Sequence, residues 1–203
     1  PGGTEMWRNT EIDQIPDANN GGTTTGWESF EGTSSTGYTI STLEVTSLNP
    51  SNRLYYGASS SSGIPELFRL DDASNSDTPT EISITNAVEG AYVHDIAVNP
   101  YNGDELIAVM SNYNIVGLYH SADGGENWTA IEGNLEGGSQ NPGPSIRNAV
   151  ILPTEEGNLY LVGTSTGVYS TMSLEGGTTN WVRESDDGSS GSIGYSVAEY
   201  IMA

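Results

Sequence analysis

The sequence contains no cysteine among its 203 residues. This absence excludes disulfide bonds, thiolate metal sites and cysteine nucleophiles. It does not settle the cellular compartment, because many secreted bacterial proteins also lack cysteine.

Basic residues are scarce as well. Five arginines stand against 27 aspartates and glutamates, which gives a formal net charge of −22. A field of this sign repels nucleic-acid phosphates and anionic membrane surfaces, so we expect no nucleic-acid partner. The charge is typical of a protein kept soluble in a crowded or salty exterior; a specific role in binding cations or a partner is the alternative.

Long apolar runs are also missing, since no stretch of about 18 apolar residues occurs. We therefore expect no membrane insertion. The chain begins at Pro1, with no Met, basic region or apolar leader before it. On this basis we expect it to be part of a larger chain or surface assembly.

Glycine, in contrast, is abundant at 26 residues, and Ser, Thr and Asn crowd the segments between short apolar runs. Charged residues make up only 16% of the chain. This composition predicts many short strands joined by many turns.

Three segments of the chain align as a repeat of about fifty residues. Each is an apolar run that stops at a proline: Pro50, Pro100 and Pro153. A proline cannot donate a hydrogen bond to a strand ladder, so the strand is expected to end there. These expected first strands cover 43–50, 93–100 and 146–153.

Three more runs of strand length follow in every unit. The second strands are expected at 54–58, 106–110 and 159–163, the third at 66–70, 117–121 and 167–171, and the fourth at 81–84, 128–131 and 181–183. Four short antiparallel strands per repeat form a β-propeller blade, because one such sheet needs neighbours stacked on its faces. A β-sandwich is the alternative, but it has no reason to repeat four strand types in order.

We therefore predict an all-β fold, a β-propeller of four-stranded antiparallel blades with about fifty residues each. A single segment covers 1–203, divided into a partial blade 1–37, blades 38–90, 91–143 and 144–193, and the start of the next blade at 194–203. The runs 5–10 and 26–30 resemble third and fourth strands, and 195–201 a first strand. Because most closed propellers have ~4–8 blades, we expect a partial propeller; a small ring with a composite blade is the alternative.

One turn carries a recognisable motif. The segment Ser121-Ala-Asp-Gly-Gly-Glu-Asn-Trp128 fits the pattern Ser-x-Asp-x-Gly-x-x-Trp at every defined position. The Asp123 carboxylate can accept turn N–H groups, glycine permits positive φ, and Trp128 can bury a large ring beneath the hairpin. The other units retain only parts of the pattern, at 70–75 and 170–181.

The segment 117–128 resembles the Asp-box (BNR-repeat) blades of sialidases, sortilin-type receptors, xyloglucanase-type glycoside hydrolases and photosystem-assembly propellers. The wider repeat is most similar to the last three. In these families the box lies on the outer rim, away from the central ligand site. The resemblance therefore implies a structural role for Ser121, Asp123, Gly125 and Trp128.

The candidates for catalysis are few. A xyloglucanase-type enzyme would use two aspartates across a cleft, and Asp95 is the best candidate for one of them. The positions aligned with it are Val45 and Asn148, so no second carboxylate can be named from the sequence. A role for Asp95 in lining the channel is the alternative. A sialidase would need three clamping arginines, and no arginine lies in the motif that family uses for its first.

Other chemistry-bearing residues have simpler explanations. Arg147 could face the central channel, although pairing with a nearby carboxylate is the simpler expectation, and His94 and His120 lie in no nucleophile context. The acidic clusters at 71–72 and 186–191 could hold Ca²⁺ but follow no EF-hand spacing, so we expect no metal or other cofactor, with Ca²⁺ as the alternative. Most aromatic residues are expected to pack inside blades.

The sequence thus predicts a secreted or cell-surface bacterial propeller module that binds a protein or carbohydrate ligand or serves structural display. Catalysis by the chain itself is not expected, and no catalytic residue is assigned. The alternative is part of a xyloglucanase-like glycoside hydrolase whose second carboxylate lies outside this segment.

Overall fold

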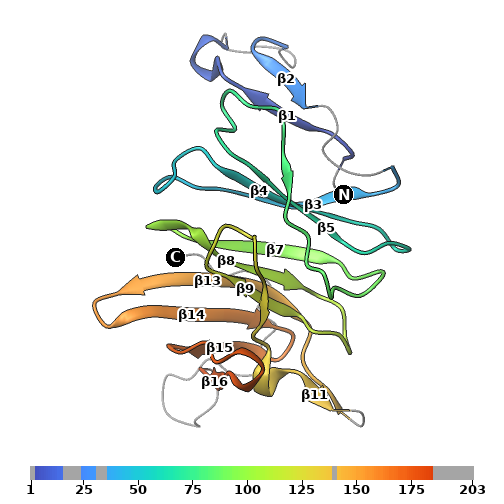
Figure 1. Cartoon of the computed structure of the whole chain (residues 1–203), viewed down its shortest axis with the longest axis vertical. Coiled ribbons are helices and arrows are strands. Elements are labelled where there is room, and N and C mark those ends of the chain that lie inside the picture. The colour runs from blue at the N-terminus through green and yellow to red at the C-terminus, as the bar shows by residue number, and fades with distance from the viewer. Residues whose placement is uncertain (1–2, 16–23, 31–35, 139–140, 185–203) are drawn as a thin grey trace.

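The computed structural model describes residues 3–15, 24–30, 36–138 and 141–184. Within these ranges the regular secondary structure consists of β-strands and three short 3₁₀ helices (Figure 1). Its strands form three four-stranded and two two-stranded antiparallel sheets. No helix in the described ranges is long and apolar enough to span a membrane.

Each four-stranded sheet is a meander whose spatial order follows the chain order. The first sheet contains β3 (Thr39–Val45), β4 (Leu54–Ser59), β5 (Glu66–Leu70) and β6 (Thr80–Glu81). The second contains β7 (Val93–Asn99), β8 (Asn102–Met110), β9 (Leu118–Ser121) and β10 (Thr129–Ala130). The third contains β13 (Ile146–Thr154), β14 (Gly157–Thr164), β15 (Gly167–Thr171) and β16 (Val182–Arg183).

Shorter elements accompany these sheets. The strand β1 (Met6–Asn9) pairs with β2 (Trp27–Phe30) near the N-terminus. The strand β11 (Gly137–Gly138) pairs with β12 (Asn141–Pro142), and in the order of the chain this pair comes after the second sheet and before the third. Three short 3₁₀ helices are present in the described ranges: η1 (Ile12–Gln14), η2 (Gly133–Leu135) and η3 (Gly176–Thr178).

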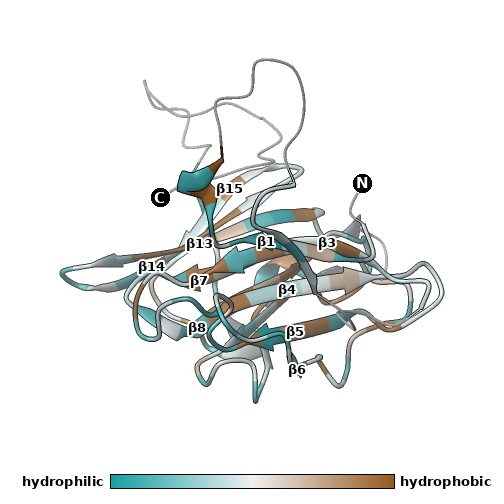
Figure 2. Cartoon of the chain, turned by 90° about the horizontal axis from the view of Figure 1, so that it is seen from above, coloured by the Kyte–Doolittle hydropathy of each residue, from teal (hydrophilic) through white to brown (hydrophobic). Residues whose placement is uncertain are grey.

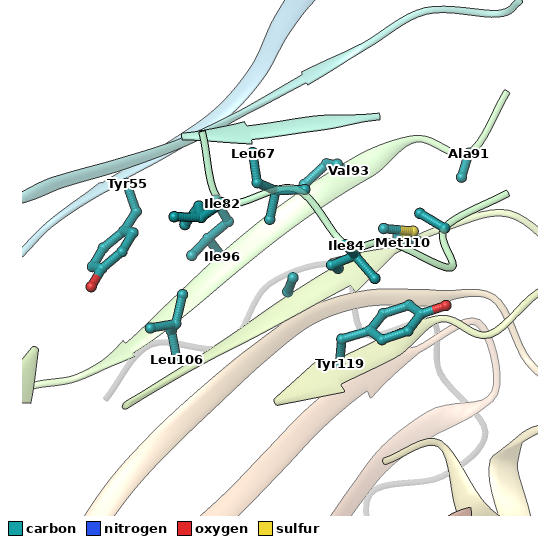
Figure 3. Close-up of a cluster of buried hydrophobic side chains, with 12 residues drawn as sticks. Tyr55, Leu67, Ile82, Ile84, Ala91, Val93, Ile96, Leu106, Met110 and Tyr119 are labelled. Atoms are coloured by element: carbon teal, nitrogen blue, oxygen red, sulfur yellow. The ribbon is translucent and has the colours of Figure 1, made fainter. Parts of the chain in front are cut away.

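The sheets stack face to face as the blades of a propeller do, so the predicted fold class, an all-β partial propeller, is confirmed (Figure 1). One apolar core lies between the first and second sheets and includes Tyr55, Leu67 and Ile96 (Figure 3). A second core lies between the second and third sheets, and a smaller one joins β1 to the first sheet. Figure 2 shows hydrophobic residues on strands such as β4 and β5, whereas many connecting turns are hydrophilic. Each sheet thus buries its faces against its neighbours, which is why the repeat is needed.

The first strand of every four-stranded sheet carries a β-bulge at the same place. The extra residue is Ser41 in β3, His94 in β7 and Arg147 in β13, and these residues are 53 apart each time. A bulge places one residue without a partner and bends the strand. The bulges therefore give the true alignment of the three units.

This alignment corrects one sequence-based expectation. The strand expected at 43–50 is β3, which runs from Thr39 to Val45, so it begins and ends earlier. The reason is the connection after it: eight residues separate β3 from β4, whereas two separate β7 from β8. Pro50 lies in this longer loop, and aligning the units on their prolines shifted the first unit by three residues.

The fourth strands are shorter than expected. The run 81–84 contributes only Glu81 to β6; Ile82 still donates its backbone N–H to the carbonyl of Leu67 in β5, and Ile82 and Ile84 pack into the core between the first two sheets. The first strand expected at 195–201 lies outside the described residues.

Candidate functional site

A groove runs along the first strands of the second and third blades, and one residue of the first strand of the first blade, Glu44, lines its edge. These strands, β3, β7 and β13, each pair with only one neighbour within their sheets, and β7 contacts both of the others. The cavity between them has a volume of about 480 Å³. We call it the inner groove; its lining includes Glu44, Asp95, Tyr101 and Asn148.

Asp95 is held in this groove by backbone hydrogen bonds. Its Oδ2 atom accepts the N–H of Ala149 in the next blade at 3.0 Å, and the carboxylate also accepts the N–H of Ile96. Burial raises the pKa of Asp95, while these hydrogen bonds and the nearby His94 oppose the rise. The carboxylate therefore joins the inner strands of two blades that share no ladder.

Glu44 is a groove residue that the sequence analysis missed. The bulges show that Thr42, and not Val45, corresponds to Asp95. Since side chains alternate along a strand, Glu44 lies two residues beyond Thr42 and on the same side. Loss of water around its carboxyl group and then the charge of Asp95 raise the pKa of Glu44, although this residue stands at the exposed mouth of the groove.

The bulged residues beside the groove have separate surroundings. The ring of His94 lies edge-on to Tyr92 at 6.1 Å between centroids. Arg147 has no carboxylate within 4.0 Å among the described residues, so the pairing expected from the sequence is not seen there. The bulges therefore bring one imidazole and one guanidinium to the inner strands, and of these His94 acts on the pKa of Asp95.

The Ser121–Trp128 turn lies at the other end of the blade, after β9. Ser121 donates to Asp123 at 2.8 Å and accepts the N–H of Gly125 at 2.9 Å, and Asp123 accepts the N–H of Asn127 at 2.8 Å. The Asn127 side chain also donates to Asp123 at 2.6 Å, and this bond, followed by that of the Asn127 backbone N–H, lowers the pKa of Asp123. The turn is thus closed on itself, which fits a structural role.

Trp128 of this turn packs against the core between the first two sheets. Its indole Nε1–H donates to the carbonyl oxygen of Ile82 in the preceding blade at 2.8 Å. Trp181 makes the same contact one blade later, with the carbonyl of Ile131 at 2.9 Å. The tryptophan of the turn therefore joins neighbouring blades.

The acidic pair that could have held Ca²⁺ is engaged by other side chains. Asp71 forms ion pairs with Arg53 and Arg69, and Asp72 accepts hydrogen bonds from Ser74 and Asn75. The described ranges contain no group of three His, Asp or Glu side chains arranged to hold a metal ion. The second acidic cluster, 186–191, lies outside them.

The catalytic reading from histidine finds no support in the geometry. His120 lies 3.4 Å from Glu105, a buried carboxylate that also accepts hydrogen bonds from Tyr160, Asn99 and Asn158. Burial alone would raise the pKa of Glu105, but the hydrogen bonds from His120, Tyr160 and Asn99 lower it to about 2. This network is packed between the second and third blades.

The comparison with solved structures identifies the architecture. The GH74 enzyme of Niastella koreensis matches with a TM-score of 0.52 and 21% identity over 73% of this chain. The chain has a propeller-type fold. The GH74 xyloglucanase of Xanthomonas campestris matches with a TM-score of 0.49 and 18% identity over 74% of the chain, and a mutant of NanB sialidase from Streptococcus pneumoniae with 0.46 and 17% over 71%.

These likenesses have clear bounds. The chain spans about a quarter of the length of the three solved structures: 23%, 24% and 23% in the same order. No family model and no curated protein matches the sequence. At 21% identity the match to the Niastella koreensis enzyme supports the propeller fold alone and leaves the chemistry of the chain to its own residues.

Proposed function

We propose that this chain is a non-catalytic propeller module of a secreted or cell-surface bacterial protein, and that it binds its ligand along the inner groove. The observation that carries this proposal is the groove itself, which lies between the second and third blades and places two carboxylates, Asp95 and, from the first blade, Glu44, on one lining. Carboxylates accept hydrogen bonds, so the fitting ligand presents donors: the hydroxyls of a glycan or the amines of a basic peptide.

The contacts of Asp95 favour binding over catalysis. Its Oδ2 atom already accepts the N–H of Ala149, and this bond joins the inner strands of two blades. A general acid or nucleophile needs an oxygen free to approach the reacting atom. The extracellular location is part of the proposal and is supported by the acidic composition, rich in Gly, Ser, Thr and Asn.

A glycoside hydrolase is the second candidate, and one specific observation favours it. Glu44 and Asp95 line the same groove, and the charge of Asp95 contributes to the raised pKa of Glu44. Two carboxyl groups of different acidity are the equipment of acid–base glycoside cleavage. Under this reading Glu44 is the acid and Asp95 its partner.

One set of measurements tests both candidates. Chitohexaose and an oligolysine peptide are titrated into the whole chain by calorimetry, at about 0.05 and 0.5 M NaCl. The module proposal expects one of them to bind and Glu44→Gln to weaken it, with salt reducing affinity only for the peptide. Release of reducing ends from soluble β-glucans, abolished by Glu44→Gln, would favour the hydrolase. If the chain neither binds these ligands nor cleaves β-glucans, both proposals are overturned.

A further inference from the structure

A second groove lies on a different part of the molecule. It is bounded on one side by η2 and the β11–β12 hairpin, and on the other by the β14–β15 turn and by β15 and β16. Its volume is about 650 Å³, and it shares no lining residue with the inner groove. We call it the rim groove; in Figure 1 β11 and β16 lie at the end of the stack farthest from β1.

The walls of the rim groove are fixed before any ligand arrives. Asn134 of η2 donates to the carbonyl of Trp181 at 3.0 Å and accepts the N–H of Trp181 at 2.7 Å. A Cβ at Gly143 would overlap the carbonyl oxygen of Leu135, so the backbone closes tightly there. A site with such walls loses little entropy on binding.

The lining of the rim groove differs in kind from that of the inner groove. Two tyrosines, Tyr113 and Tyr169, stand with Pro142, Pro144 and Leu135, and Ser165 and Thr166 supply hydroxyl groups. Tyr113 is 53% exposed, and the Tyr169 hydroxyl lies 3.2 Å from that of Thr166. Among the described residues no carboxylate lines the groove, although the chain carries 27 acidic residues, and the charged side chain of its described lining is that of Arg183.

We propose that the rim groove binds a neutral saccharide. Aromatic rings pack against the C–H face of a sugar, while hydroxyl groups and main-chain atoms bond its hydroxyls. A lining without titrating carboxylates gives binding that depends little on pH and salt. The Arg183 side chain, which donates to the Thr166 carbonyl, holds the turn that forms one wall.

The test uses the whole chain and three neutral hexasaccharides: cellohexaose, mannohexaose and chitohexaose. We expect at least one to bind, and Tyr113→Ala to weaken it by about tenfold or more, because the tyrosine ring covers apolar ligand surface. The matched control is Tyr92→Ala, which removes another tyrosine, 45% exposed, from outside this lining. Affinity should be equal at about 0.05 and 0.5 M NaCl.

The outcomes separate this proposal from the inner-groove proposal. Glu44→Gln should leave rim binding unchanged, since Glu44 lines only the inner groove. Thermal unfolding of each variant checks that the fold is intact. Hexagalacturonate and a proline-rich peptide are titrated as comparison ligands. The proposal is overturned if no neutral hexasaccharide binds or if Tyr113→Ala binds it as tightly as the parent chain. It is also overturned if Tyr113→Ala weakens only the binding of hexagalacturonate or of the peptide.

Discussion

The carboxylate of Asp95, on the inner strand of one blade, accepts the backbone N–H of Ala149 on the inner strand of the next blade at 3.0 Å. The two strands belong to separate sheets and form no ladder with each other. The Asp95 side chain thus joins two blades by a hydrogen bond, as backbone hydrogen bonds join the strands within each blade. The bond also places Asp95 in the inner groove with its orientation fixed.

The first prediction concerns this bond. Asp95→Ala should lower the free energy of unfolding by about 1–3 kcal/mol at pH 7, because the Ala149 N–H loses its acceptor. Asp95→Asn keeps an oxygen and removes a charge whose burial raises the pKa, so it should be at least as stable as the parent chain. Urea unfolding measures both. Equal stability of the two variants would show that the bond contributes nothing.

The second prediction concerns Glu132, a buried residue that accepts the N–H of Gly117 at 2.6 Å. Burial, opposed by that hydrogen bond and reinforced by Glu136, raises its pKa to about 7 from 4.5. Its stabilising effect is full below pH 4.5 and is lost as the pH rises through 7. Glu132→Gln should therefore be more stable than the parent chain by about 1–3 kcal/mol at pH 8 and not at pH 4. A constant difference across this range would contradict the raised pKa.

The third prediction has the opposite sign. The pKa of Glu105 is lowered to about 2 from 4.5, so its contribution is present above pH 4.5 and is lost as the pH falls toward 2. Glu105→Gln should cost about 1–3 kcal/mol at pH 7 and progressively less below pH 4.5. Chemical unfolding of both proteins at a series of pH values gives the comparison. If the loss persists undiminished at pH 2.5, ionisation of Glu105 is not its cause.

The fourth prediction concerns the tryptophans that join blades. Trp181 is only 2% exposed, so Trp181→Ala should cost about 3–5 kcal/mol, and Trp181→Phe about 1–2 kcal/mol for the lost bond to Ile131. Trp128→Ala should cost less, because Trp128 is only partly buried. Trp27→Ala, at a site 42% exposed, is the control and should change stability by under about 0.5 kcal/mol. Thermal or urea unfolding ranks the four variants.

Much of the blade could be predicted from local pattern. The third strand at 66–70 coincides with β5, and that at 167–171 with β15, because alternating apolar residues between turn-forming residues leave little freedom. The register of the first unit could not be fixed in this way. Proline marks a strand end only where the following connection is short, and the loop after β3 is long.

For the same reason, only one of the two carboxylates of the inner groove, Asp95, could be predicted from the sequence. With the first unit shifted by three residues, Val45 was aligned with Asp95 in place of Thr42, and Glu44 was overlooked. The spacing of 53 residues between Ser41, His94 and Arg147 is the signal that would have found it, but three unlike side chains reveal no pattern until the bulges are seen. The partner of Trp128 was hidden too, because its bond reaches across 46 residues to a carbonyl, which any residue type can supply.

The equal spacing of the bulges defines a segment of 53 residues that could be inserted or removed as a whole. Because the same distortion recurs every 53 residues, a segment of that length can be cut at equivalent points and inserted or removed with its bend in phase. The contacts that cross from blade to blade start and end within such a segment and its immediate neighbour. Recombination in whole segments would therefore lengthen or shorten the protein while keeping the contacts between neighbouring segments.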